Sequence, residues 1–111
     1  MDMVPSKKDW KLFRGKIATW QESYMEKLVK EYSVLLNDDL PASSKFWELE
    51  KRIKQDKNTP GVMINLSKQQ MLFDINRLIN DGVITMDDLQ GFSDELRDNI
   101  KFMQENMNYE I

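Results

Sequence analysis

Carboxylates are the side chains of this sequence best suited to catalysis, and they occur in three groups. The groups are Glu48/Glu50, Asp87/Asp88 and Asp94/Glu95/Asp98. Acid–base catalysis needs two carboxyl groups that converge in a cleft and differ in pKa. Most of these pairs lie near expected helix starts, where an acidic residue already stabilises the helix dipole. The sequence also has no Gly-rich phosphate loop, no Ser nucleophile motif and no Glu-x-x-His pair. We therefore predict that the chain is not an enzyme.

The chain of 111 residues has neither His nor Cys. This composition excludes a disulfide, a zinc site of Cys and His, a thiol nucleophile and a His general base. We accordingly expect no cofactor and no bound metal.

The segment around Gly82 has some features of a calcium-binding loop. Placing Gly82 at the sixth position of an EF-hand loop puts Asp88 at the twelfth, as that motif requires. The same alignment puts Arg77 at the first position and Ile79 at the third, where calcium needs oxygen ligands. We interpret the segment as a joint between two helices, with no calcium site.

Basic residues are concentrated near the N-terminus. Residues 1–30 hold seven Lys/Arg against four Asp/Glu, a net charge of +3, whereas residues 61–111 hold four against nine, a net −5. Two clusters could bind phosphate, which gives an alternative function as a small nucleic-acid-associated regulator. They are Lys7, Lys8 and Lys11, and Lys51, Arg52 and Lys54. We do not favour nucleic acid as the partner, because the whole chain carries a net −3 and such binders are usually basic.

The elements that position these residues are predicted to be helices. No segment alternates apolar and polar residues cleanly between turn signals, so we expect no significant sheet. The predicted fold is all-α, a four- to five-helix bundle with a long N-terminal helix. Residues 1–111 are expected to form a single helical domain, with frayed ends at 1–5 and 106–111.

The first helix is predicted over 7–36, with Ser6 and Asp9 as a capping box at its start. With Trp10 at zero and 100° per residue, its apolar side chains form a stripe from about −80° to +40°. A second set, Ala18, Met25, Val29 and Leu36, widens the stripe to about +100°. A straight helix of this length is roughly 45 Å long and overhangs a compact domain, unless Gly15 kinks it.

Three further helical regions follow. The second is predicted over 42–57, with Phe46, Leu49 and Ile53 on one narrow face. The third starts at a capping box of Ser67 and Gln70, with Leu66 and Met71 as hydrophobic staple, and ends at Asn80 before a left-handed Gly82. Thr85 and Asp88 cap the fourth, which Gly91 is expected to split into segments 86–90 and 94–105.

Two polar residues lie inside the apolar stripe of the first helix, Arg14 at about +40° and Gln21 at about +20°. Arg14 could extend to water from the helix start, which is the structural explanation. Alternatively, both residues could face a partner protein and set its register, as polar residues do in coiled coils.

The breadth of this stripe suggests the function. We expect a small non-catalytic protein-interaction or regulatory protein, adaptor- or immunity-like, because the narrower stripes of the other helices leave part of the first helix uncovered. The partner would be another protein or a second copy in a homodimer. The expected interface residues are Trp10, Arg14, Ile17, Trp20, Gln21, Tyr24 and Leu28.

A cytoplasmic location is expected. The sequence has no charge-free apolar run of about 18 residues that could span a membrane. Its N-terminal segment lacks the apolar stretch of a secretory signal, and the absence of Cys fits a reducing compartment.

Overall fold

The computed structural model describes residues 4–106 and places four α-helices and no strand in that range. The helices are α1 (Lys7–Leu36), α2 (Ala42–Asp56), α3 (Met71–Asn80) and α4 (Asp94–Asn106). Two 3₁₀ turns, η1 (Lys68–Gln70) and η2 (Met86–Leu89), precede α3 and α4. The predicted all-α class and the long first helix are confirmed. Within the described range, no helix combines the length and the apolar character needed to cross a membrane.

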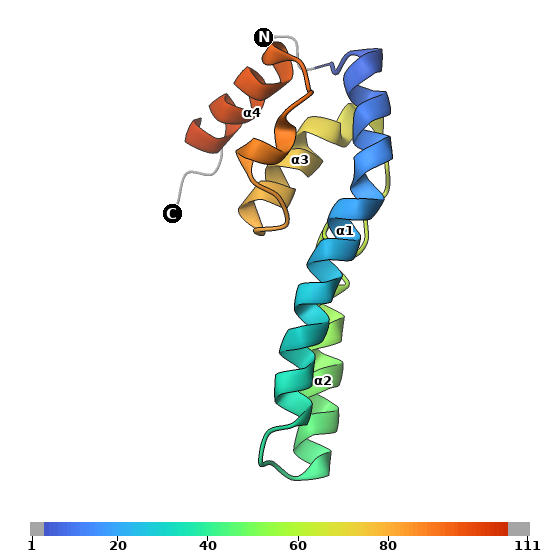
Figure 1. Ribbon diagram of the computed structural model, residues 1–111, viewed down its shortest axis with the longest axis vertical. Coiled ribbons are helices and arrows are strands. Elements are labelled where there is room, and N and C mark those ends of the chain that lie inside the picture. Colours follow the sequence, from blue (N-terminus) through green and yellow to red (C-terminus); the bar gives the residue numbers. More distant parts are fainter. Residues whose placement is uncertain (1–3, 107–111) are drawn as a thin grey trace.

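The helices form two parts that share α1 (Figure 1). The first half of α1 packs with α3, η2 and α4, and we call this part the head. The second half of α1 forms an antiparallel hairpin with α2, and we call this part the stalk. The molecule is consequently elongated, with extents of 54 × 33 × 22 Å and a radius of gyration of 16.6 Å. The overhang expected of a long α1 is present, but α2 folds back along it.

The hydrophobic core lies in the head. Its fully buried members come from α1, α3, η2 and α4, and include Phe13, Ile75, Leu78, Leu89 and Ile100. Three aromatic rings, Trp10, Phe13 and Trp20, follow one another along α1 with centroids 6.2 Å apart, and Trp20 reaches Phe92 at 6.3 Å. The stalk adds only Leu28 and Leu35 to the buried apolar residues.

The start of α1 is tied to the start of α4. The Ser6 hydroxyl oxygen accepts a hydrogen bond from the Asp9 N–H at 3.1 Å, as the predicted cap requires. The Asp9 carboxylate turns instead towards Ser93. It accepts hydrogen bonds from the Ser93 N–H at 2.9 Å and from the Ser93 hydroxyl at 2.6 Å. Ser93 also accepts a hydrogen bond from the Leu96 N–H at 3.1 Å, so Asp9 holds the residue that caps α4.

The start of α3 differs from prediction, whereas the capping box before the fourth helical region forms as predicted. Ser67 makes no side-chain capping bond, and α3 begins at Met71 after the turn η1, because the first turn is the tighter 3₁₀ form that often precedes an α-helix. Of the two residues of the expected staple, Met71 is buried and Leu66 is exposed. The Thr85–Asp88 capping box is present and begins η2, which is the first of the two expected segments. Gly82 and Gly91 have φ of 75° and 93°, and Gly91 separates η2 from α4 as expected.

Two further predictions concern Gly15 and the two ends of the chain. The helix is continuous through Gly15, where an added Cβ would have no atom within 4 Å. Of the segments expected to fray, residues 1–3 and 107–111 lie outside the described range. Pro5 is buried, and Asn106 is the last residue of α4.

Candidate protein-interaction surface

The stalk is a two-helix hairpin with little buried surface of its own. Leu28 and Leu35 of α1 point towards α2, and the Tyr32 hydroxyl donates a hydrogen bond to the Asp56 carboxylate across the hairpin. No residue of α2 is buried. Since helices in proteins are stabilised chiefly by packing of an amphipathic face, α2 is an unusually bare element.

One side of the stalk is an exposed apolar surface. Met25, Val29 and Leu36 lie at +60° to +100° on the wheel of α1, and Ile53 joins Met25 and Val29 in a groove of about 220 Å³ between the helices. Phe46 lies two turns before Ile53 on the same face of α2, and its ring meets Trp47 edge-on at 4.9 Å. We call this set the stalk apolar face: Met25, Val29, Leu36, Phe46 and Ile53, which are 38–63% exposed.

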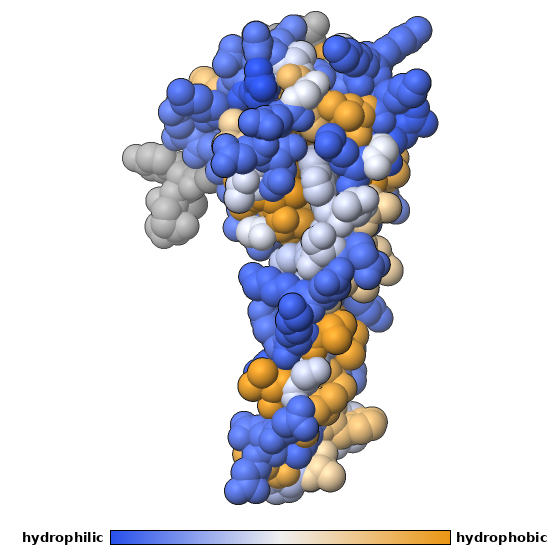
Figure 2. All heavy atoms as spheres, in the orientation of Figure 1, coloured by the Kyte–Doolittle hydropathy of each residue, from blue (hydrophilic) through white to orange (hydrophobic). Residues whose placement is uncertain are grey.

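This face points away from the head. The α1 residues that enter the head core, such as Phe13 and Trp20, lie at negative angles on the same wheel. Figure 1 accordingly shows the head to one side of α1, and Figure 2 shows apolar side chains along the opposite edge of the stalk. The head therefore leaves the stalk apolar face open to a partner.

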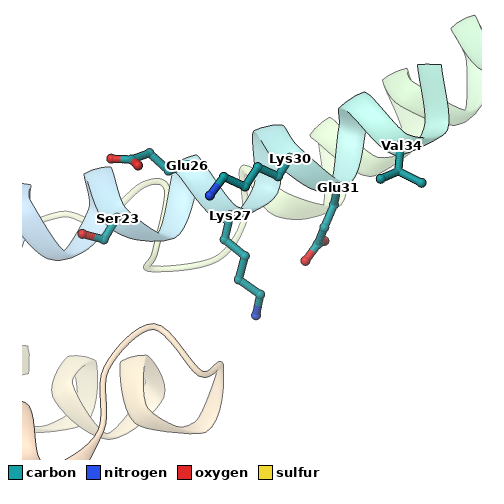
Figure 3. Close-up of a pocket in the computed structure, with 6 residues that line it drawn as sticks. All are labelled: Ser23, Glu26, Lys27, Lys30, Glu31 and Val34. Atoms are coloured by element: carbon teal, nitrogen blue, oxygen red, sulfur yellow. The ribbon is translucent and has the colours of Figure 1, made fainter. Parts of the chain in front are cut away.

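The other side of the stalk is charged. A shallow hollow of about 390 Å³ lies there, and Figure 3 shows Lys27 and Glu31 of its lining pointing to the side on which the head lies. Its lining residues are Ser23, Glu26, Lys27, Lys30, Glu31 and Val34. Val34 is 73% exposed, but its neighbours in this hollow are polar or charged. The two sides of α1 thus differ in character, and Val34 offers a matched control for the apolar face.

The hydrogen bond between Tyr32 and Asp56 predicts a response to alkaline pH. Burial, followed by this hydrogen bond, raises the pKa of Tyr32 from 10.0 to about 12. Because the folded-state pKa exceeds that of the unfolded chain, the stabilisation is complete below pH 10 and is lost as the pH rises towards 12. The loss of stability over pH 10–12, measured by urea unfolding, is expected to be smaller in Tyr32→Phe than in the wild type. An identical pH profile in both proteins would contradict this assignment.

Six of the seven expected interface residues are engaged within the chain. Ile17 and Leu28 are buried, and Trp10 and Trp20 pack against the head core. Tyr24 and Gln21 lie at the junction of head and stalk, where the Gln21 amide donates to the Pro60 carbonyl at 2.9 Å. These contacts cover the centre of the predicted α1 stripe. The part of the stripe that stays exposed is its edge at +60° to +100°, which carries Met25, Val29 and Leu36.

Arg14 is the exposed member of the predicted set. Its guanidinium lies over the Trp10 ring, 5.3 Å from the centroid. The side chain therefore extends along the surface of the head, in line with the structural explanation given for it above. Gln21 differs, because its side-chain amide donates a hydrogen bond to the Pro60 carbonyl of the same chain.

The two basic clusters are not brought together. Lys7, Lys8 and Lys11 lie at the start of α1, whereas α2 pairs with the part of α1 beyond Met25. At 1.5 Å per residue, the clusters are at least about 20 Å apart along the axis. Within α2, Arg52 pairs with Glu48 at 3.3 Å and Lys54 with Glu50 at 3.5 Å. The two sets do not form one continuous phosphate-binding surface.

The acidic residues of the described range likewise form no metal-binding cluster. Within residues 4–106, no group of three or more Asp and Glu is arranged to hold a metal ion. Burial raises the pKa of Asp74, and nearby Arg77 opposes the rise. Asp74 Oδ2 is buried without a hydrogen-bond partner in the described part of the chain. A single buried carboxyl does not supply the converging pair that acid–base catalysis needs.

Sequence reasoning missed the contribution of α2 to the exposed surface. The signal was present in the adjacent Phe46 and Trp47, which lie about 100° apart on a helix and cannot both face a single neighbouring helix. The evidence for the stalk apolar face is therefore the exposure and the apolar character of its side chains. Comparison with protein-family models, with curated proteins and with solved structures finds no significant match to this chain.

Proposed function

We propose that this chain is a small non-catalytic protein-interaction protein and that its binding surface is the stalk apolar face. The observation that carries the proposal is the exposure of five large apolar side chains on one side of a hairpin whose second helix buries none of its residues. The sequence-based hypothesis placed the contact on the aromatic centre of α1. The proposal moves it to the open edge of that helix and to α2.

The amount of exposed surface supports an interaction. At roughly 200 Å² for a large side chain, the exposed fractions correspond to on the order of 500 Å² of apolar area. Patches of about this size are the largest found on typical single proteins, and they are often functional. The face also includes the aromatic ring of Phe46, with Trp47 beside it, and aromatic residues are enriched at the energetic centres of interfaces.

Site-specific photo-crosslinking tests the proposal. A benzophenone amino acid replaces Phe46 in one variant and Val34 in another, and each is expressed and irradiated in cells. We expect a discrete crosslinked protein product from position 46 and none from position 34, because only the first lies on the stalk apolar face. The product is measured by its mass and by peptide mapping.

The control position makes the result interpretable. Val34 is more exposed than Phe46, so accessibility alone favours crosslinking at position 34. Equal labelling from both positions, or no discrete product from position 46, would remove the stalk apolar face as a binding surface.

A further inference from the structure

We infer that the stalk apolar face binds the same face of a second copy of this chain, so that two hairpins form a four-helix bundle. This inference rests on the proposed function and names its partner. Three observations support it: the area of the face, its position relative to the head, and the charges along its two edges.

The area matches what a stable dimer needs. A standard protein interface buries about 800 Å² on each partner, of which somewhat more than half is apolar. The roughly 500 Å² of exposed apolar surface on the stalk supplies that share. Pairing two stalks would also give α2 the second neighbour that it lacks within one chain, since helices of a four-helix bundle each contact two others.

A twofold axis along the stalk gives such a pairing. This symmetry places α1 of one copy opposite α2 of the other, with the two heads at the same end. Each head lies on the side of α1 away from the stalk apolar face, so both heads point outwards (Figure 1). The heads therefore do not obstruct contact between the stalks.

The charges along the two edges of the face are complementary in this arrangement. The α1 edge carries Glu22, Glu26 and Lys30, a net −1, and it borders Met25 and Val29. On the wheel of α2, Lys57, Glu50 and Lys54 lie 20–80° beyond Phe46, a net +1, and because Glu50 pairs with Lys54, Lys57 is the unbalanced charge of this α2 edge. The twofold axis brings each α1 edge against the α2 edge of the other copy. Because Lys57 lies at the level of Met25 and Val29, it meets Glu26 of the second copy.

Sedimentation equilibrium over a hundredfold range of concentration tests the dimer directly. The wild type is expected at twice the chain mass of 13.2 kDa. Val29→Glu combined with Phe46→Glu should give a monomer, because four carboxylates would be buried in the bundle. Val34→Glu should remain a dimer. Circular dichroism establishes that each variant keeps its helices.

A charge exchange tests the pairing. Glu26→Lys and Lys57→Glu are each expected to raise the dissociation constant about five- to tenfold, since each puts like charges together twice per dimer. The double variant Glu26→Lys, Lys57→Glu should restore the wild-type value, which a different protein partner would not do.

Each outcome decides the inference. A folded wild type that stays monomeric, a dimer unaffected by the Val29 and Phe46 changes, or a charge exchange without restoration would overturn it. A monomer that still gives a crosslinked product with a different protein from position 46 would leave the proposed function in place. Absence of any product from that position would count against both.

Discussion

Replacing Asp9 by alanine is expected to lower the free energy of unfolding by about 3 kcal/mol. The Asp9 side chain is 2% exposed and accepts two hydrogen bonds from Ser93, which in turn caps α4. A bond to a charged group contributes about 1.5–3 kcal/mol, and loss of a helix cap costs about 1 kcal/mol. The substitution leaves the Ser93 N–H without this acceptor and loosens the start of α4. Urea unfolding followed by circular dichroism measures the change.

A double-mutant cycle separates this contact from a general effect of losing charge. Ser93→Ala removes the hydroxyl but keeps its N–H, so we expect a smaller loss, and the two changes together should cost less than their sum. Asp98→Ala is the matched control. Asp98 is exposed on α4, and its loss is expected to change stability by less than about 0.5 kcal/mol. Strict additivity of Asp9→Ala and Ser93→Ala would show that the two residues do not act together.

The helices could be predicted closely because their signals are local. The bounds of α1 follow from Ser6, whose hydroxyl caps the first turn, and from the break that leads to Pro41. Gly82 and Gly91 have positive φ and end or separate helical segments where the sequence places them. Such signals need only a few neighbouring residues, and they act in the same way in any fold.

The partner of Asp9 could not be predicted from the same evidence. A Ser-x-x-Asp sequence indicates a capping box, and one half of it forms between Ser6 and the Asp9 N–H. The carboxylate, however, bonds to Ser93, 84 residues away in the chain. The choice between a local and a distant partner depends on how the head packs, which periodicity does not specify.

The candidate surface shows the same division between local and distant information. The helical wheel gives the full width of the α1 stripe, and the structure divides that width among three environments. The head covers its negative angles, α2 covers its centre near Leu28 and Leu35, and the edge at Met25 and Val29 stays open. A wheel reports which residues share a face. It does not report how far round the helix a neighbour reaches, and this decides which residues a partner can touch.

Gly61→Ala is expected to lower the free energy of unfolding by about 2–3 kcal/mol, because Gly61 fills the junction of head and stalk. An added Cβ would lie 2.5 Å from Tyr24 Cδ2 on α1 and 2.7 Å from Val83 Cγ2 in the head. The preceding Pro60 is buried and accepts the hydrogen bond from Gln21, so the loop has little room to move away. The cost arises from steric overlap of the new methyl group and not from backbone strain, since Gly61 does not have a positive φ. Thermal and urea unfolding both measure it.

Gly15→Ala is the control for this prediction, because its added Cβ meets nothing within 4 Å and lies inside α1. There the change should raise stability by about 0.5–1 kcal/mol through the higher helix propensity of alanine. Combining Gly61→Ala with Tyr24→Ala should cost less than the sum of the single changes, since removal of the ring opens space for the new methyl group. If Gly61→Ala were as stable as the wild type, the loop would have to shift freely. The head and the stalk would then not be held in a fixed relation by this junction.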